Sequence, residues 1–216
     1  MEQNNSLVKD KKVLVLFLIA SHRQFLDELP KILRHGNADG VILTNLFGSE
    51  ILTNGPFPNL LHLASLAKRR FSEKQVGVEI YDSKDIASTV YAINWAKSEG
   101  FDHLWCKDGN SIVDKISEDS IIVYGADNID MPALENIKRI KESLLSQQTL
   151  VVCGGITLEN VEQFIPYSDT LVIHSAATLG KEDPYTYNHV KINEFCKKVK
   201  NHSAPDLTSN TSSNSN

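Results

Sequence analysis

Short runs of apolar, β-branched residues alternate with amphipathic stretches along most of the chain, and this alternation constrains the fold more than any other feature. It is typical of parallel strands joined by right-handed helical crossovers. The pattern predicts seven strands, at 13–20, 40–44, 76–81, 103–107, 120–124, 150–153 and 171–174. It predicts helices between and after them, at 24–35, 59–71, 84–98, 132–147, 158–165 and 188–200.

Several of these helices have start or stop signals. Thr157 directly precedes the helix expected at 158–165, and Glu159 falls near its positive end, as is favourable for a helix start. Gly36 and Gly100 stand where two other helices should end. We therefore expect Thr157 to cap a helix.

One connection does not fit a regular repeat of strands and helices. Residues 108–119 separate two predicted strands but are too few for a further helix, strand and helix. We expect at most a turn or two of helix there, around 112–116. A barrel of eight such units needs about 200 residues or more. A shortened or distorted barrel of about seven strands therefore competes with an open doubly wound sheet.

The length of 216 residues favours one substantial domain, expected over residues 11–200. Residues 1–10 are polar and predict a flexible leader, and the Ser- and Asn-rich residues 201–216 predict a disordered tail. The apolar run 13–20 follows lysines, but a cleavage site is missing and the run fits a buried strand better than a signal peptide. These features favour a cytoplasmic protein.

Charge and cysteine content exclude several classes of partner. A net charge of -5 argues against a surface that binds nucleic acid. No stretch reaches the roughly 18 apolar residues of a membrane helix, so we expect no membrane insertion. Cys106, Cys153 and Cys196 are scattered and odd in number, which predicts reduced, buried thiols rather than disulfides or a zinc site. The sequence indicates no metal and no cofactor.

The sharpest functional signal is the pair of segments VVCGGITLENV and LVIHSAATL. In the first, a buried strand ends at Gly154 and Gly155, where backbone amides without side chains can approach an anion. In the second, another strand leads to the small residues Ser175 and Ala176, as expected beside a phosphate group in barrels whose last two loops share that role. The alternative is that the glycines make a tight turn and the small residues let a helix pack.

Longer stretches of the chain resemble phosphate-binding TIM barrels, and in particular the BtpA/SgcQ family. The matching stretches, which cover much of residues 38–184, are ADGVILTNLFGSE, PFPNLLHLASLAKR, VGVEIYDSKD, AINWAKSEGFDHLWCKDG and LVVCGGITLENVEQFIPYSDTLVIHSAATLGKEDP. The resemblance implies a TIM-barrel-like parallel α/β repeat, incomplete or distorted, that binds a phosphorylated ligand through Gly154, Gly155, Ser175 and Ala176. His174 stands where the family commonly has glycine, which puts a side chain where backbone would meet phosphate.

Catalytic groups of such folds sit at the carboxyl ends of the strands. Glu79 ends the third predicted strand and points inward if Val78 and Ile80 face the helices, so it is a candidate general base. Lys107 follows as a candidate to stabilise a developing oxyanion, and Asp127 as a second carboxylate for proton transfer. The alternative is that these residues cap helices or lie at a solvated rim.

Three hypotheses on function remain open at this stage. The first is a protein of BtpA type that binds a phosphorylated or otherwise anionic small metabolite. The second is an isomerase or aldolase of a phosphorylated sugar or a related metabolite. The third is a non-catalytic assembly or biogenesis factor. The sequence leaves open whether the chain is an enzyme and whether it forms a homo-oligomer.

Overall fold

The computed structural model describes residues 10–44, 60–80, 86–108, 111–124, 133–180 and 182–203. For residues 86–88, 107, 108, 124 and 203 it describes the backbone alone. Most of the expected leader and tail lies outside the described residues.

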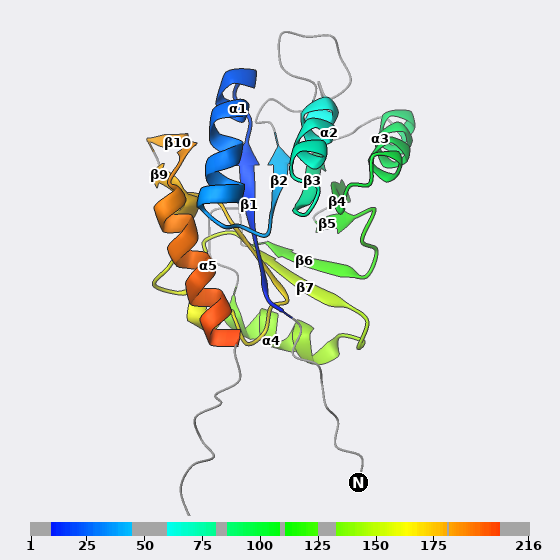
Figure 1. Cartoon of the computed structure of the whole chain (residues 1–216). Coiled ribbons are helices and arrows are strands. Elements are labelled where there is room, and N and C mark those ends of the chain that lie inside the picture. The colour runs from blue at the N-terminus through cyan, green and yellow to red at the C-terminus, as the bar shows by residue number, and fades with distance from the viewer. Residues whose placement is uncertain are drawn as a thin grey trace, which may run out of the picture.

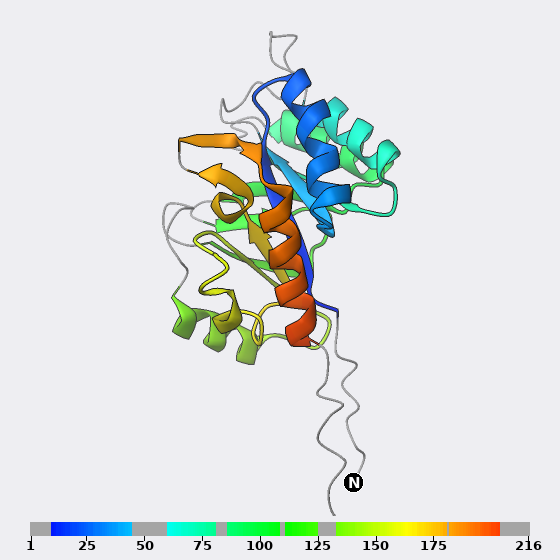
Figure 2. The same ribbon diagram turned by 60° about the vertical axis from the view of Figure 1, so that its left-hand side comes forward.

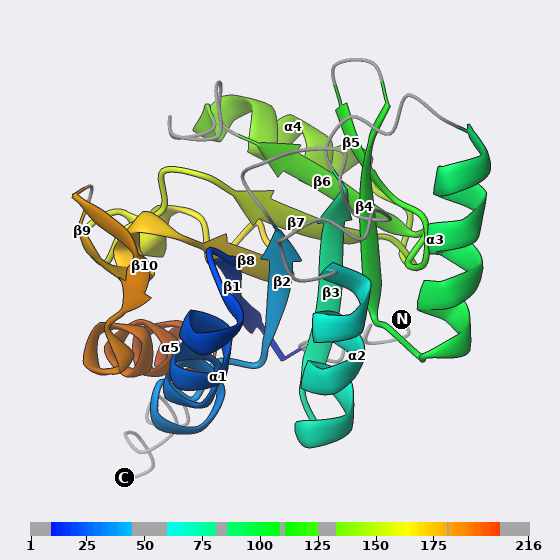
Figure 3. The same cartoon turned by 90° about the horizontal axis from the view of Figure 1, so that it is seen from above.

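Eight strands form a closed barrel in which each strand pairs with its neighbours in chain order and the last pairs with the first (Figures 1 and 3). The strands are β1 (Lys12–Leu18), β2 (Gly40–Thr44), β3 (Gln75–Ile80), β4 (His103–Asp108), β5 (Ser111–Asp114), β6 (Ser120–Tyr124), β7 (Thr149–Cys153) and β8 (Thr170–Ile173). The seven predicted strands all lie in this barrel. Because β8 pairs with β1, the barrel is closed, and the competing open sheet is wrong.

The eighth strand, β5, is the part that the sequence did not predict. It runs antiparallel to both β4 and β6, whereas the other neighbours pair in parallel. The turn or two of helix expected around 112–116 is therefore wrong. A connection of this length is too short for a helical crossover, but a reversed strand needs only tight turns at its two ends. The reversed strand fills the gap and closes the barrel.

Side chains alternate between the barrel interior and the helices outside, as the period of a strand requires. One buried cluster fills the interior, and it consists of Leu14, Leu16, Ile42, Trp105, Val151, Cys153 and Val172. Gly77 faces the same interior, where a Cβ atom would lie 2.6 Å from the His103 Cβ and 2.7 Å from the Ile42 Cδ1. The interior has no room for a side chain at this position, so the close approach of β3 to its neighbours requires glycine.

Helices flank the barrel, and their outer faces are solvated (Figure 2). They are α1 (His22–Pro30), continued by a π-helical segment (Lys31–His35), α2 (Leu60–Arg70), α3 (Ile86–Ser98), α4 (Leu134–Ser143) and α5 (His189–Ser203). Gly100 has a φ of 69° after α3, as expected of a helix end, whereas Gly36 keeps a helical φ of -78°. None of the described helices has both the length and the apolar character to cross a membrane.

The helix expected at 158–165 is wrong, because only a short 3-10 turn (Val161–Gln163) forms there. The Asn160 side chain explains the difference. Its Oδ1 accepts a hydrogen bond from the Thr157 amide at 2.8 Å, and its Nδ2 donates to the Gly155 carbonyl at 2.9 Å. Asn160 thus organises a compact loop, and Thr157 does not cap a helix.

A hairpin of β9 (Thr178–Gly180) and β10 (Asp183–Tyr187) follows the barrel and packs beside β1 and α1 (Figure 1). The Tyr187 hydroxyl donates to the Leu16 carbonyl at 3.1 Å and accepts from the Leu18 amide at 2.9 Å. The Tyr187 amide donates to Glu28 Oε2 at 3.0 Å. These bonds attach the hairpin to the carboxyl end of the first strand.

Candidate functional site

Glu79 lies inside the barrel near the carboxyl end of β3. Its neighbours Val78 and Ile80 belong to the core beneath the helices, so alternation directs Glu79 inward, as predicted. It is 2% exposed, and its backbone pairs with that of Trp105 on β4. A carboxylate at this depth is in a position to meet a ligand that enters from the carboxyl ends of the strands.

His174 follows β8, and its ring is largely enclosed. The Nε2 atom is buried and has no hydrogen-bond partner within the described ranges. Burial lowers the pKa of His174, although the Pro184 carbonyl on β10 favours the protonated ring. The imidazole is therefore neutral at neutral pH. The His174 side chain thus occupies the end of the last strand, as predicted, and its ring contacts the hairpin at Pro184.

Gly154 and Gly155 form the turn that the sequence singles out. Their φ angles are 93° and 60°, which glycine adopts without strain. Cys153 pairs with Val172, so the turn continues next to the segment that follows β8. There Ser175–Ala177 form a short 3-10 turn in which Ser175 is exposed. The structure therefore brings the two predicted segments side by side at the carboxyl end of the barrel.

The anion site that the sequence predicts depends on the backbone amides of this edge. Among the described residues, no hydrogen bond is made by the amides of Gly155, Ser175 or Ala176. The positive helix end expected after Gly155 is absent, since no helix begins at Thr157. An anion at this edge would therefore meet amide groups alone, as in the concave backbone arrangements that bind anions without a helix.

Two of the predicted catalytic groups cannot be placed beside Glu79. Lys107 lies in β4, where its backbone pairs with that of Ile112. Only the backbone of Lys107 is described, and Asp127 lies outside the described residues. The roles expected for these two residues stay predictions.

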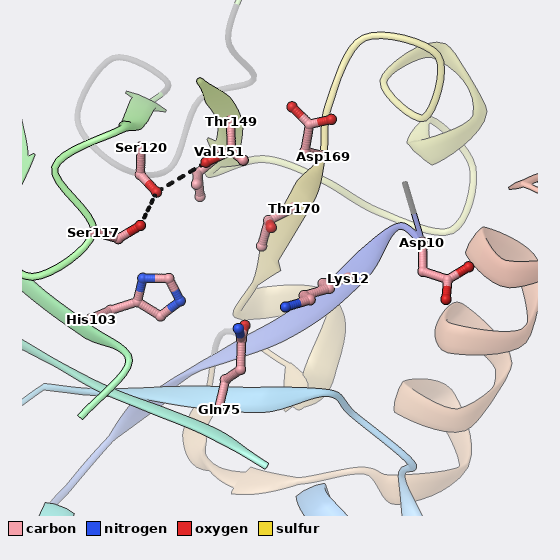
Figure 4. A pocket seen from close by; sticks show the side chains of 10 residues that line it. All are labelled: Asp10, Lys12, Gln75, His103, Ser117, Ser120, Thr149, Val151, Asp169 and Thr170. Carbon is pink, nitrogen blue, oxygen red and sulfur yellow. Dashed lines mark hydrogen bonds between the residues drawn. The ribbon is translucent and has the colours of Figure 1, made fainter. Parts of the chain in front are cut away.

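A polar pocket of about 380 Å³ lies at the opposite, amino end of the strands (Figure 4). His103 lines it, and its Nδ1 lies 2.7 Å from Asp114 Oδ2. No sequence pattern pairs these two residues, because Asp114 reaches this end only through the reversed strand β5. The sequence does place His103 at the start of a predicted strand, and hence at the amino end of the barrel.

Cys106, Cys153 and Cys196 are buried, and none of the three forms a disulfide. Within the residues that the structure covers, no three His, Cys, Asp or Glu side chains gather in a way that could hold a metal ion.

Solved structures similar to this chain share its fold at low identity, whereas no family model and no curated protein matches it. Tryptophan synthase from Mycobacterium tuberculosis is 11% identical, with a TM-score of 0.58 over 89% of this chain and 94% of that one. The tryptophan synthase alpha chain from Legionella pneumophila subsp. pneumophila is 14% identical, with a TM-score of 0.54 over 88% and 92%. A native KDPGal structure is 12% identical, with a TM-score of 0.52 over 94% and 98%.

These likenesses and the closed barrel agree on the fold class. The chain is a TIM-barrel-like α/β protein, as the resemblance to phosphate-binding barrels implied. It differs from a regular member of that class in the reversed strand β5. At these identities the comparisons concern the fold alone.

Proposed function

We propose that this chain binds a phosphorylated or otherwise anionic small metabolite in the cytoplasm, at the edge formed by Gly154, Gly155, Ser175 and Ala176. The observation that carries the proposal is the set of unengaged amides on two adjacent segments, which belong to Gly155, Ser175 and Ala176. Amides that converge on one point attract the oxygens of an anion. The resemblance to the BtpA/SgcQ family supports the same ligand class.

The location supports the proposal as well. The loops after the last two strands hold the phosphate group in many TIM barrels, and this edge follows β7 and β8. The buried Nε2 of His174 and the inward Glu79 lie at the same end of the barrel. A ligand held by its phosphate group would extend from the amides towards these two side chains.

Thermal-shift measurements with phosphorylated sugars and nucleotides test the binding proposal. We expect at least one such compound to raise the melting temperature of the natural sequence, because a ligand that binds only the folded state stabilises it. Gly155→Asp should remove the shift, since its carboxylate would repel the anion and its side chain would cover the amides.

Gly100→Asp is the matched control for that variant. Gly100 also has a positive φ, and a Cβ atom there would meet no atom within 4 Å. The control therefore introduces the same charge and a similar backbone strain away from the edge. We expect Gly100→Asp to keep the ligand-dependent shift. Loss of the shift in both variants, or no shift in the natural sequence, would contradict the proposal.

A second candidate function is acid–base catalysis on the bound metabolite, with Glu79 as general base. The burial and inward direction of Glu79 favour it, because a buried carboxylate near a ligand can accept a proton. With a substrate identified by the binding screen, Glu79→Gln should lower kcat at least about a hundredfold and leave the ligand-dependent thermal shift in place. An unchanged kcat would rule out Glu79 as the general base.

A further inference from the structure

The floor of the barrel, at the amino ends of the strands, is lined by polar side chains that differ from the apolar layer above them. Each of six strands contributes its first residue to the pocket there, and these residues are Lys12, Gln75, His103, Ser120, Thr149 and Thr170. The next inward position of the same strands is apolar or glycine, for example Leu14, Gly77 and Trp105. The polar groups therefore form one layer that faces a single space (Figure 4).

The reversed strand β5 supplies the carboxylate that orients His103. Because β5 runs opposite to its neighbours, its last residue, Asp114, lies at the amino end of the barrel and is 1% exposed. Asp114 Oδ1 accepts from the amides of Leu104, Ile116 and Ser117 at 2.9 to 3.1 Å. The carboxylate is thus fixed in place and ionised, because these bonds and His103 outweigh the cost of burial and lower its pKa.

A fixed carboxylate determines which nitrogen of His103 carries the proton. Asp114 Oδ2 can only accept, so Nδ1 of His103 donates to it across 2.7 Å. In the neutral ring Nε2 is then an acceptor. His103 is 7% exposed, and its buried Nε2 has no partner among the described residues although the ring lines the pocket. The ring therefore presents to the pocket a nitrogen without a partner, which accepts when the ring is neutral.

Gln75 and Lys12 face the same space (Figure 4). The buried Oε1 of Gln75 is a second acceptor that lacks a partner in the described part of the chain. The Lys12 ammonium makes no ion pair with a described carboxylate. Asp169, at the pocket wall, is paired with Lys141 at 2.8 Å. The lining thus offers the Lys12 ammonium, which lies in the same lining as the carboxylates of Asp10 and Asp169, and two buried polar atoms that lack a partner among the described residues.

Hydroxyl groups complete one side of the pocket. Ser120 Oγ lies 2.9 Å from Ser117 Oγ and 3.0 Å from Thr149 Oγ1, and such a chain can reverse its direction to donate or to accept. The volume of about 380 Å³ is near the lower end of the range for small-molecule sites. The pocket therefore fits a compact ligand with several hydroxyl groups.

We propose that this pocket is a second binding site, specific for a small hydroxy acid. Its hydroxyl groups donate to His103 Nε2 and Gln75 Oε1, and its carboxylate pairs with the Lys12 ammonium. The site lies at the opposite end of the barrel from Gly155, so it is independent of the proposed anion edge.

Ring ¹⁵N NMR of the full chain labelled at histidine tests the proposal with three probes of six carbons each. Gluconate carries both the hydroxyl groups and the carboxylate, sorbitol lacks the carboxylate, and hexanoate lacks the hydroxyl groups. We expect gluconate to shift the His103 Nε2 resonance to saturation, and sorbitol and hexanoate to shift it much less. The His174 Nε2 resonance reports on the other end of the barrel and should stay unchanged.

Lys12→Met should weaken gluconate binding at least about tenfold, which corresponds to one lost hydrogen bond to a charged group. Lys12 is exposed, so the variant should remain folded. Lys11→Met is the matched control, because the Lys11 ammonium donates to the Ser168 carbonyl at 2.6 Å instead of facing the pocket. It should bind gluconate as the natural sequence does.

Three results would overturn the proposal. They are the absence of a saturable His103 shift with gluconate, an equal response to sorbitol or hexanoate, and unchanged binding in Lys12→Met. Gly155→Asp separates the two sites: it should abolish the phosphate-dependent thermal shift and leave the response of His103 to gluconate intact. Failure at one site therefore does not imply failure at the other.

Discussion

Among single residues, Asp114 is the one whose hydrogen bonds most clearly stabilise the barrel. It is buried and accepts from three amides, from Trp105 Nε1 at 3.2 Å and from His103. We expect Asp114→Asn to lower the free energy of unfolding by about 3 kcal/mol, because the amide group cannot accept on both sides and leaves buried donors unsatisfied. Urea unfolding at pH 7 measures this loss.

The lowered pKa of Asp114 also predicts how the stability of the folded chain changes at acid pH. The pKa of Asp114 in the folded chain is below its ordinary value, so its contribution is fully present above the unfolded pKa of about 3.9. That contribution is lost as the pH falls through the lower folded pKa. The natural sequence should therefore lose more stability than Asp114→Asn when the pH is lowered from about 5 towards 2. Glu118→Gln, at an exposed position, should follow the natural sequence.

Among the elements, the β9–β10 hairpin is attached to β1 by the Tyr187 hydroxyl and by Gln24 Nε2, which donates to the carbonyls of Leu18 and Tyr185. Tyr187 is 2% exposed, and burial raises the pKa of its hydroxyl, which therefore stays protonated and able to donate to the Leu16 carbonyl. We expect Tyr187→Phe to cost about 1 to 3 kcal/mol, because the Leu18 amide and the Leu16 carbonyl lose their partner in a buried place.

Amide hydrogen exchange localises that effect. In Tyr187→Phe the Leu18 amide should exchange faster, since it donates to the Tyr187 hydroxyl in the natural sequence. Tyr185→Phe is the control, because it changes the same hairpin. Among the described residues the Tyr185 hydroxyl makes no hydrogen bond, and the bond from Gln24 goes to the Tyr185 backbone carbonyl. Equal exchange of the Leu18 amide and equal stability in the two variants would show that the hydrogen bonds of the Tyr187 hydroxyl do not hold the hairpin on β1.

The elements also show which parts of the fold can be predicted from sequence. The strands at 40–44 and 120–124 have the predicted bounds, because a short run of apolar, β-branched residues between turns favours a strand. The four-residue β5 has too few residues for such a pattern, and it forms because β4 and β6 need a partner. The segment 158–165 forms only a short 3-10 turn, and the bonds of the Asn160 side chain to the Thr157 amide and the Gly155 carbonyl are not visible in a pattern of apolar residues.

The candidate sites also contain residues that can be predicted from the sequence and residues that cannot. Gly154 and Gly155 could be placed from sequence because they directly follow a predictable strand. The inward direction of Glu79 followed from the alternation of its neighbours. The pair of His103 and Asp114 could not be predicted, since it depends on the reversal of β5 rather than on any spacing.

At the scale of the whole molecule, the barrel has polar groups at both ends and an apolar layer between them. The upper end carries the amides of Gly155, Ser175 and Ala176, and the lower end carries His103 above an ionised carboxylate. The apolar layer, with Trp105 fully buried, separates the two. Ligands at the two ends should therefore bind without competing.

Amide ¹H–¹⁵N NMR with inorganic phosphate tests the central claim most directly. The account predicts saturable shifts centred on the amides of Gly155, Ser175 and Ala176, because these groups would donate to the phosphate oxygens. Saturable shifts should be absent in Gly155→Asp and present in Gly100→Asp. Phosphate shifts centred on Lys12 and His103, or no saturable shift at Gly155, would contradict it.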